Sequence, residues 1–575
     1  MGGNKLRSTF LYALFAALWL YVFFMSVVKP PFLSYYTFDE TFVTDSGVFL
    51  WYGITPRILD WPASPSVLMY AGIFGLSLLY QVAAHLSELK GFLDAFVVMD
   101  RTAYDYLFDR EAYILAGRAV QLLIVLTVML WTIRWLMRKT NVLLTDQSRF
   151  WIILVLISTH LLWNNGVVLR PEAISAVFFL HILCRLVFSE RLAWKDVWVL
   201  SLLFGIVVAE RLIFMFMAPF FWCSIWLLSD TARWSRLQVS IGVFTVSFLA
   251  FCPFVLSDPL IVSKAFFGGI MAKVNDAPME TFFNRGFIAS YFESPAGYLA
   301  LLLTLLGITR LVKEKKAIYF VMIGNWLFFL FLVLKSSKIY DPHVLPGALI
   351  NLLLIGLGLA SVVEMAGRKY RYLGWAVAGL IVLGEVVAVV SYHSWVRRKT
   401  NVQAAVNWVI KELPADASIL ANIDVGLFIP PNNAALQRQI SAADNIENRV
   451  RKLNYLMGLN TISQGGITAK EMPMAAAAFA FEDEELFGLQ YRLLQKYGED
   501  EKRKRFDIDL AVENNTLLYH GVPQAEADER FRNGHYTYLV TDDELEGLTP
   551  LKEFGGNDGA PLRVYKSVVK PSTGP

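Results

Sequence analysis

The chain has 575 residues, of which 56% are hydrophobic and 18% are charged, with a mean hydropathy of +0.47. Soluble proteins carry about a quarter charged residues, so this composition excludes an ordinary soluble enzyme. Residues 1–400 hold 34 Lys and Arg against 24 Asp and Glu, whereas residues 401–575 hold 18 against 25. Positive charge beside apolar runs reflects orientation in a membrane. We therefore expect a polytopic membrane protein without a nucleic-acid partner.

The first long apolar run covers residues 10–28 and follows Lys5 and Arg7. It is too long for the apolar core of a signal peptide, and Lys29-Pro30-Pro31 follows it in place of a small-residue cleavage site. We interpret it as a retained first membrane helix.

Clusters of Lys and Arg follow five later apolar runs, and they set the topology if all of them face the cytoplasm. About eleven spans of membrane-crossing length are then expected: residues 9–28, 112–134, 148–165, 172–188, 196–210, 212–229, 237–257, 296–312, 317–334, 343–365 and 373–392. Residues 1–392 would form the transmembrane domain, with the N-terminus inside.

One apolar segment, residues 66–86, does not fit this count, because a span there would invert the later basic clusters. We predict a helix at the external interface instead. Residues 29–111 then form one large external loop with juxtamembrane helices. A second external loop, residues 257–295, is long enough to be a lid or binding loop.

The pattern changes after Thr400. Residues 402–413 have helical periodicity, and residues 418–421, 537–541 and 562–566 have the composition of strands. The charged runs at 482–485 and 499–505 are typical of solvated helix faces. Residues 393–575 are therefore predicted to be an extracytoplasmic α/β domain.

Asp39 and Glu40 are adjacent about ten residues after the first apolar run. Two neighbouring carboxylates at a lipid–water boundary are costly to desolvate, so they are candidates for catalysis. The alternative is an ordinary solvated loop.

Further charged residues lie on the side predicted to be external. Arg57 and Asp60 share a Pro-containing turn, which could equally be a structural turn anchored by Trp61. Arg170 and Glu172 flank Pro171 at the start of a span, where Glu172 would interact favourably with the positive helix end and Arg170 could hold a phosphate.

Glu210 and Arg211 interrupt 34 largely apolar residues, 196–229. They form either an ion pair at a helical hairpin or a site in which Arg211 faces an anionic headgroup and Glu210 orients it. Lys338, Tyr340 and His343 close another span externally. A Lys is a mobile point charge suited to a phosphate.

The three cysteines, Cys184, Cys223 and Cys252, lie in apolar runs and fit neither a metal-ligand spacing nor a disulfide framework. The sequence contains no P-loop, dinucleotide fingerprint, HExxH or GxSxG motif. An external active site would therefore need an activated substrate that arrives through the membrane. A polyprenyl-phosphate sugar donor meets that requirement.

This arrangement resembles the GT-C superfamily of integral membrane glycosyltransferases, in the branch of protein O-mannosyltransferases and aminoarabinose transferases. The family's first external loop carries an Asp-Glu pair, which Asp39-Glu40 matches, followed by a Gly- and Pro-containing stretch similar to residues 53–66. Arg118 opens the second span, residues 205–211 look like the family's Gly-rich span with a basic residue, and residues 338–346 are similar to its late Tyr-hydrophobic-Pro span start.

The resemblance implies an inverting transfer, with Asp39 as the general base on the acceptor and Glu40 orienting Asp39 or the sugar. Arg211 and Lys338, with Arg170 or Arg57, would stabilise the departing phosphate. The supporting residues are Asp60, Glu172, Glu210, Tyr340 and His343. Relatives often have an Asp, sometimes a metal ligand, where this chain has Arg170-Pro171-Glu172, so the need for a divalent cation stays open and no cofactor is assigned.

We expect a bacterial inner (plasma) membrane location over the endoplasmic reticulum because no retention signal ends the chain, and the predicted topology puts the active site and C-terminal domain on the periplasmic side. The acceptor could be a glycolipid, a glycan or a protein. The alternative function is a secondary transporter or flippase of lipid-linked saccharides, which would be expected to have repeated halves and interrupted membrane helices. A scaffold or receptor would need no boundary carboxylate pair.

Overall fold

The structure of the chain is a computed structural model. It describes residues 2–28, 38–53, 64–86, 91–108, 110–139, 141–166, 170–229, 232–257, 295–335, 341–365, 371–397, 400–415, 417–422, 425, 429–444, 489, 492–493, 496–497, 504–512, 521–555 and 561–568. The chain divides into two compact units, and each is described by itself. The first unit comprises residues 1–29, 58–68 and 117–393, and the second comprises 30–57, 69–116 and 394–575.

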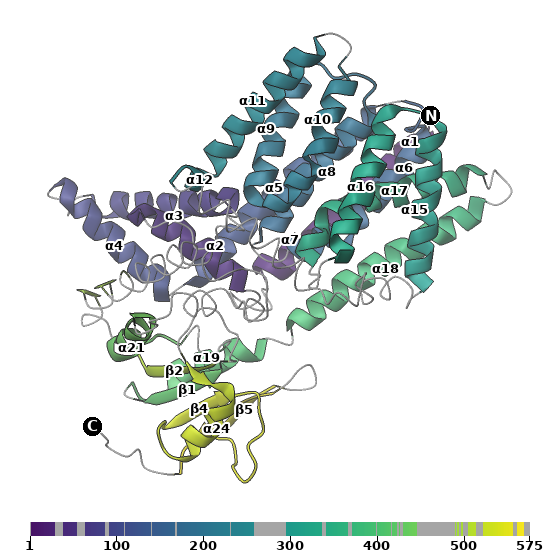
Figure 1. The fold of residues 1–575 in the computed structure, drawn as a ribbon. Helices are drawn as coiled ribbons and strands as arrows, with labels where there is room; N and C mark the ends of the chain where they lie inside the picture. The colour runs from purple at the N-terminus through teal and green to yellow at the C-terminus, as the bar shows by residue number, and fades with distance from the viewer. Residues whose placement is uncertain are drawn as a thin grey trace. The chain divides into compact units, whose positions relative to one another are not determined.

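The first unit is helical (Figure 1). Helices occupy all eleven predicted spans: α1 (Gly2–Phe23) with the π-helix η1 (Phe24–Val28), α5 (Arg110–Arg138), α6 (Asp146–Ser158), α7 (His160–Gly166), α8 (Pro171–Phe188), α9 (Trp194–Glu210), the 3-10 helix η3 (Leu212–Met217), α10 (Ala218–Leu227), α11 (Arg233–Phe251), α12 (Phe254–Ser257), α15 (Pro295–Lys313), α16 (Ala317–Lys335), α17 (Asp341–Met365) and α18 (Arg371–Arg397). The predicted span 148–165 is not one helix, because it breaks at Thr159 between α6 and α7.

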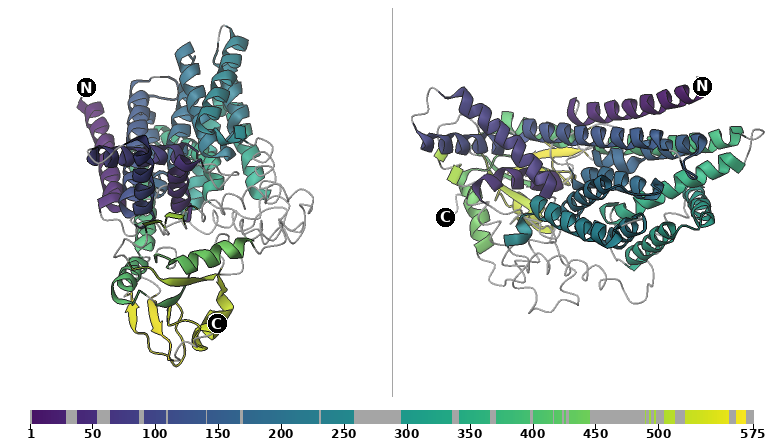
Figure 2. Two further views of the ribbon diagram at one scale, coloured as in Figure 1. Left: turned by 90° about the vertical axis from the view of Figure 1, so that its left-hand side faces the viewer. Right: turned by 90° about the horizontal axis from the view of Figure 1, so that it is seen from above.

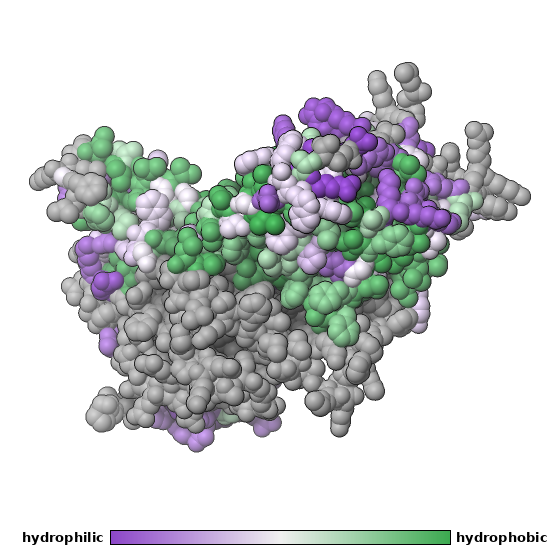
Figure 3. All heavy atoms as spheres, turned by 45° about the horizontal axis from the view of Figure 1, so that its top comes forward, coloured by the Kyte–Doolittle hydropathy of each residue, from purple (hydrophilic) through white to green (hydrophobic). Residues whose placement is uncertain are grey.

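Within the described residues, seven helices are long and apolar enough to cross a membrane. They are Leu6–Val28, Ser64–Ala84, Ala112–Arg138, Pro171–Phe188, Arg233–Phe251, Val344–Met365 and Trp375–Tyr392. Large apolar side chains such as Val246, Phe331 and Leu380 are exposed on these and neighbouring helices. Figure 3 shows such apolar side chains over the visible helix surface. Apolar surface of this extent is compatible with a hydrocarbon environment, and the chain is a multi-pass membrane protein.

The interfacial placement of residues 66–86 stays a prediction, because α3 (Ser64–Ala84) also meets these criteria of length and composition.

Close approach of two backbones holds α15 against α17. A Cβ at Gly307 would lie 2.1 Å from the carbonyl oxygen of Leu354, and one at Gly358 would lie 1.9 Å from that of Leu303. Small residues at such contacts let membrane helices pack without a side chain between them. A similar contact joins α9 to α11, where a Cβ at Gly205 would lie 2.6 Å from Cβ of Ser247. The views in Figures 1 and 2 show α9 and α11 running side by side.

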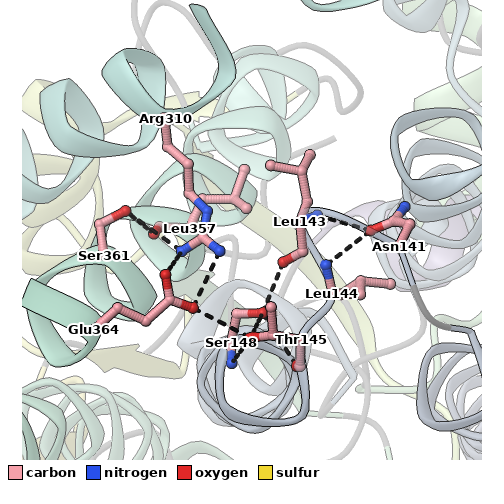
Figure 4. A network of polar contacts seen from close by, with 9 residues as sticks. All are labelled: Asn141, Leu143, Leu144, Thr145, Ser148, Arg310, Leu357, Ser361 and Glu364. Carbon is pink, nitrogen blue, oxygen red and sulfur yellow. Dashed lines mark hydrogen bonds and ion pairs between the residues drawn. The ribbon is translucent and has the colours of Figure 1, made fainter. Parts of the chain in front are cut away.

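A polar network joins the ends of α15 and α17 to the start of α6 (Figure 4). Arg310 forms an ion pair with Glu364 at 3.1 Å, and the Glu364 carboxylate accepts a hydrogen bond from the Thr145 hydroxyl at 3.2 Å. Thr145 is also the N-cap of α6, where its side chain accepts from the Ser148 backbone N–H. We call this set (Thr145, Ser148, Arg310, Ser361 and Glu364) the Arg310 network.

The second unit contains a six-stranded sheet in the order β3-β2-β1-β4-β6-β5. Its strands are β1 (Ser418–Asn422), β2 (Asp507–Val512), β3 (Val522–Pro523), β4 (Tyr538–Thr541), β5 (Lys552–Phe554) and β6 (Leu562–Lys566). Strand β1 pairs in parallel with β2 and β4, whereas β6 is antiparallel to β4 and β5. Helices α19 (Thr400–Glu412), α21 (Asn433–Asp444) and α24 (Gln524–Arg532) accompany the sheet. The three predicted strands and the helix at 402–413 are confirmed.

One interpretation in this region was wrong in part. Lys504 and Arg505, predicted within a solvated helix face, lie in extended chain directly before β2. The Lys504 ammonium donates to the carbonyl oxygens of Lys411 at 2.7 Å and Leu413 at 2.9 Å. A cation is favourable there because the last carbonyls of α19 have no partner within the helix. Residues 482–485, and nearly all of the second predicted external loop, lie outside the described residues.

The second unit also contains helices of the first predicted loop: α2 (Phe38–Phe49), the 3-10 helix η2 (Leu50–Tyr52) and α4 (Phe92–Phe108), with most of α3. The Tyr106 hydroxyl on α4 donates to Asp45 at 2.6 Å and lies 2.8 Å from the Thr44 hydroxyl, and these groups are buried. This contact fixes α2 against α4.

Candidate functional site

Four helix ends in the first unit bring polar residues together. Helix α8 begins at Pro171, α9 ends at Glu210, α11 ends before Cys252, and α3 begins at Ser64. Helix ends leave backbone N–H and C=O groups without intrahelical partners, so polar side chains are needed there. We call the resulting set the polar site (Ser64, Ser66, Glu172, Glu210, Arg211 and Cys252).

Glu210 interacts with the first turn of α3. Its Oε2 accepts from the Ser66 backbone N–H at 2.9 Å, and its Oε1 accepts from the Ser66 hydroxyl. Glu210 is 0% exposed. The two hydrogen bonds compensate part of the cost of burying a carboxylate, and Glu210 thereby satisfies an amide at the start of α3. Beside it, the Ser64 hydroxyl lies 3.2 Å from the Cys252 sulfur.

Arg211 is ion-paired with Glu172 through Oε1 of that carboxylate. The Glu172 side chain is 1% exposed, and that of Arg211 is 12% exposed. The other oxygen, Glu172 Oε2, is buried and has no hydrogen-bond partner among the described residues. A carboxylate oxygen in that position can still accept one proton donor from a ligand.

The pairing differs from the one the sequence suggested. We expected Glu210 and Arg211, which are adjacent, to form a pair or to orient one another. Glu210 instead lies at the last position of α9, and Arg211 has extended backbone geometry (φ −144°, ψ 105°). The two side chains therefore reach different elements, α3 and α8 respectively. The prediction that Pro171 starts a helix with Glu172 in its first turn is confirmed.

Hydrogen bonds also fix the position of Arg170, the N-cap of α8. Its backbone N–H donates to Gln121 Oε1 at 3.0 Å, and Gln121 Nε2 donates to the carbonyl oxygen of Asn165 at 3.4 Å. One helical turn before Gln121, Arg118 is 1% exposed and donates to the carbonyl oxygen of Ser26 at 3.2 Å. The ends of α1, α7 and α8 are thus tied to α5.

The structure describes only part of the predicted site. Asp39 and Glu40 lie in the first turn of α2, and their side chains are not among those described. His343 lies in the first turn of α17, with its side chain likewise undescribed. Arg57, Asp60, Lys338 and Tyr340 lie outside the described residues. Of the predicted set, the polar site brings together Glu172, Glu210 and Arg211, and the ion pair is between Glu172 and Arg211.

A second polar cluster, which the sequence did not indicate, lies within the second unit. The Asp100 carboxylate on α4 accepts from the Tyr52 hydroxyl at 3.1 Å and from the Lys496 ammonium at 2.8 Å. Burial and the neighbouring Asp100 raise the pKa of Tyr52 above its ordinary value. The hydrogen bond to Asp100 raises the pKa of Lys496. The ring of Tyr497 contacts the ring of Tyr104, so Lys496 and Tyr497 join this part of the C-terminal region to α4.

Within the described residues, no group of three or more His, Cys, Asp or Glu side chains has an arrangement suited to a metal ion. In the polar site, one oxygen of Glu172 is engaged by Arg211, and both oxygens of Glu210 are engaged by Ser66. These residues do not fit a divalent cation, and we assign no step to one.

No protein-family model and no curated protein matches the chain. Two solved structures are similar to it: ArnT from Cupriavidus metallidurans in the apo state and ArnT from Cupriavidus metallidurans bound to undecaprenyl phosphate. The first is 10% identical, covers 97% of this chain and 98% of its own, and has a TM-score of 0.44. The second is 12% identical, covers 98% and 99%, and has a TM-score of 0.42.

Proposed function

We propose that this protein is a membrane glycosyltransferase that moves a sugar from a polyprenyl-phosphate donor to an acceptor outside the cytoplasm. The observation that carries the proposal is the pair formed by Glu172 and Arg211, buried where α8 begins and α9 ends. A largely buried cation beside a carboxylate oxygen that has no partner among the described residues can bind a ligand that has both an anionic group and hydroxyl donors. A sugar phosphate on a lipid has both.

The position of the site supports a lipid-borne substrate. It is built from the ends of helices that include three of the candidate membrane spans, Ser64–Ala84, Pro171–Phe188 and Arg233–Phe251. Such a location favours a substrate whose apolar part stays in the bilayer while its headgroup reaches the ends of the helices. In the predicted topology this side is extracytoplasmic, which in a bacterium is the periplasmic side of the inner membrane.

In the proposed reaction, the acceptor hydroxyl or amine attacks the anomeric carbon of the donor. A bond forms between the acceptor atom and that carbon, and the bond from the carbon to the phosphate oxygen breaks. Asp39 accepts the acceptor's proton as the general base, oriented by Glu40. Arg211, with Arg170, Lys338 or Arg57, stabilises the negative charge on the released polyprenyl phosphate.

The test is to incubate the purified full-length protein in lipid nanodiscs with a panel of polyprenyl-phosphate sugars and mixed acceptors, and to identify products by mass. A transferred sugar together with released polyprenyl phosphate supports the proposal. Absence of any transfer across the panel, with a folded protein, counts against it. Asp39→Asn should lower the rate by at least about 10²-fold, the scale of a lost general base.

The matched control for Asp39 is Asp45, which lies on the same helix and is buried against the Tyr106 hydroxyl. Asp45→Asn should lower the melting temperature, whereas Asp39→Asn should leave it unchanged. Wild-type turnover by Asp39→Asn would reject Asp39 as the base.

A flippase of lipid-linked saccharides is the second candidate, because the break at Thr159 between α6 and α7 is an interruption of a kind that transporters use. The two functions differ in covalent outcome. A flippase moves the intact donor between leaflets, whereas a transferase releases polyprenyl phosphate. Proteoliposomes with a labelled donor in one leaflet distinguish the two functions in one experiment, because the label either appears intact in the other leaflet or is separated from polyprenyl phosphate.

A further inference from the structure

A charged residue in the most exposed of the candidate spans has a specific partner. Glu385 is the only Asp, Glu, Lys or Arg between Arg371 and Arg397, and it lies within the span Trp375–Tyr392, of which 11% is buried. Placing a carboxylate within a membrane span costs free energy unless another group binds it. The proposed mechanism assigns no role to Glu385 and so does not explain why this costly residue is present.

The partner of Glu385 is the first residue of α7. Oε2 of Glu385 accepts from the His160 backbone N–H, and the His160 ring Nδ1 lies 2.7 Å from the same oxygen. The side chains are 41% exposed for His160 and 21% for Glu385. The His160 backbone N–H donates to Glu385 at the point where the helix is interrupted, because α6 ends at Ser158 and Thr159 is extended (φ −61°, ψ 129°).

Both residues lie at a similar depth. Thr159 lies ~20 Å along the helix axis from Asp146, where α6 starts, and Glu385 lies ~21 Å along α18 from Arg371, at ~1.5 Å per residue. Both starting points follow predicted cytoplasmic clusters of Lys and Arg. The contact thus sits well inside the ~30 Å hydrocarbon layer.

Helix α7 connects this contact to the polar site. It has seven residues, His160–Gly166, so its two ends are ~9 Å apart. At its other end, the Asn165 carbonyl oxygen accepts from Gln121, which in turn accepts from the backbone N–H of Arg170. Arg170 is the N-cap of α8, and Glu172 two residues on is paired with Arg211.

We propose that Glu385 is a positioning residue: it anchors the start of α7 and thereby holds Arg170 and the first turn of α8 in the geometry that binds the donor's phosphate. This inference rests on the proposed function for the identity of the ligand. Its structural part, the anchoring of α7, does not.

The experiment uses the full-length protein in nanodiscs. Glu385→Ala removes the acceptor, and Glu385→Gln keeps an acceptor oxygen with two lone pairs but removes the charge. The matched control is Glu364→Ala, which removes the partner of Arg310 in the Arg310 network. Two quantities are measured: amide hydrogen exchange in peptides that contain residues 160–166, and the affinity for polyprenyl phosphate from tryptophan fluorescence.

Glu385→Ala should accelerate exchange in residues 160–166 and weaken polyprenyl phosphate binding about tenfold, the scale of one hydrogen bond to a charged group. Glu385→Gln should stay within about twofold of wild type in affinity, as should Glu364→Ala. Unchanged exchange in Glu385→Ala overturns the anchoring of α7. Faster exchange with unchanged affinity overturns the positioning role. Glu385→Gln as defective as Glu385→Ala overturns the hydrogen bond as the cause.

The two proposals fail separately in this design. A wild-type protein that binds no polyprenyl phosphate argues against the proposed function, while the exchange data still decide whether Glu385 anchors α7. A wild-type protein that binds polyprenyl phosphate, with no effect of Glu385→Ala on either quantity, rejects both the anchoring of α7 and the positioning role, while the proposed function stands.

Discussion

The polar contacts at the two ends of the helices in the first unit differ in kind. At the start of α8 and the end of α9, the carboxylates of Glu172 and Glu210 are almost fully buried. At the opposite ends of other helices, cations bind backbone oxygens: where α5 ends, Arg149 on α6 donates to the carbonyl oxygens of Met137 at 3.0 Å and Lys139 at 2.7 Å. Arg236 likewise donates to the carbonyl oxygen of Leu192.

This difference distinguishes contacts that only stabilise the fold from a candidate ligand-binding site. Side chains such as Arg149 and Arg236 satisfy carbonyl groups at the ends of helices, which is a sufficient reason for their presence. Glu172 has a buried oxygen that no described group satisfies. Leaving such an acceptor without a partner costs stability, and a ligand that supplies a donor would recover that cost. Four predictions test this contrast.

The largest effect is expected for Glu172→Ala. This change leaves the Arg211 guanidinium, 12% exposed, without its carboxylate. Removing one partner of a buried ion pair typically costs about 3–5 kcal/mol. We expect a large drop in the thermal unfolding midpoint of the full-length protein in nanodiscs. A variant that melts like wild type would contradict the assignment of Glu172 and Arg211 as a buried ion pair.

The double variant Glu172→Leu with Arg211→Met separates stability from binding. Replacing both members of a buried ion pair with apolar residues is often neutral or stabilising, so the melting temperature should return close to the wild-type value. Polyprenyl phosphate binding should remain weak, because the cation is gone. Normal binding by this variant would make the pair a structural feature only.

A smaller effect is expected for Ser66→Ala. This change removes the hydroxyl that donates to Glu210 but keeps the backbone N–H, which also donates to that carboxylate. An unsatisfied buried acceptor costs about 1–3 kcal/mol. The control is Ser64→Ala, whose hydroxyl faces the weak acceptor sulfur of Cys252. Unfolding measurements should show a larger loss of stability for Ser66→Ala than for Ser64→Ala. Equal losses of stability would contradict the assigned role of Glu210.

The smallest effect is expected for Glu364→Ala in the Arg310 network. Its side chain is 35% exposed, and ion pairs near the surface contribute about 0–1 kcal/mol. We expect a melting temperature within a few degrees of wild type and unchanged donor use. A loss of stability comparable to that of Glu172→Ala would remove the contrast between the polar contacts at the two ends of the helices.

The positions of the helices followed from the sequence, because each span requires an uninterrupted apolar run of sufficient length, and such runs are visible without knowing any contact. The break at Thr159 did not follow. Thr159 and His160 lie within an apolar context, and neither Pro nor Gly marks the interruption. The carboxylate of Glu385, 225 residues away in sequence, accepts the hydrogen bond from the His160 N–H at this break.

The candidate site shows the same division. The sequence identified Glu172, Glu210 and Arg211 because charged residues in apolar surroundings stand out. It did not predict their partners. Adjacent residues at the end of a helix point to different neighbours, so Glu210 binds Ser66 and Arg211 binds Glu172. Ser66 could have been suspected from Ser64-Pro65-Ser66, a helix start whose amides need an acceptor.

The sequence by itself determined that the chain is a multi-pass helical membrane protein with a C-terminal α/β region, since hydropathy, charge bias and residue periodicity are local properties. Tertiary structure alone decided which charges meet. Pairing depends on how far helix ends extend and which elements pack together, and those distances are set by contacts between residues remote in sequence.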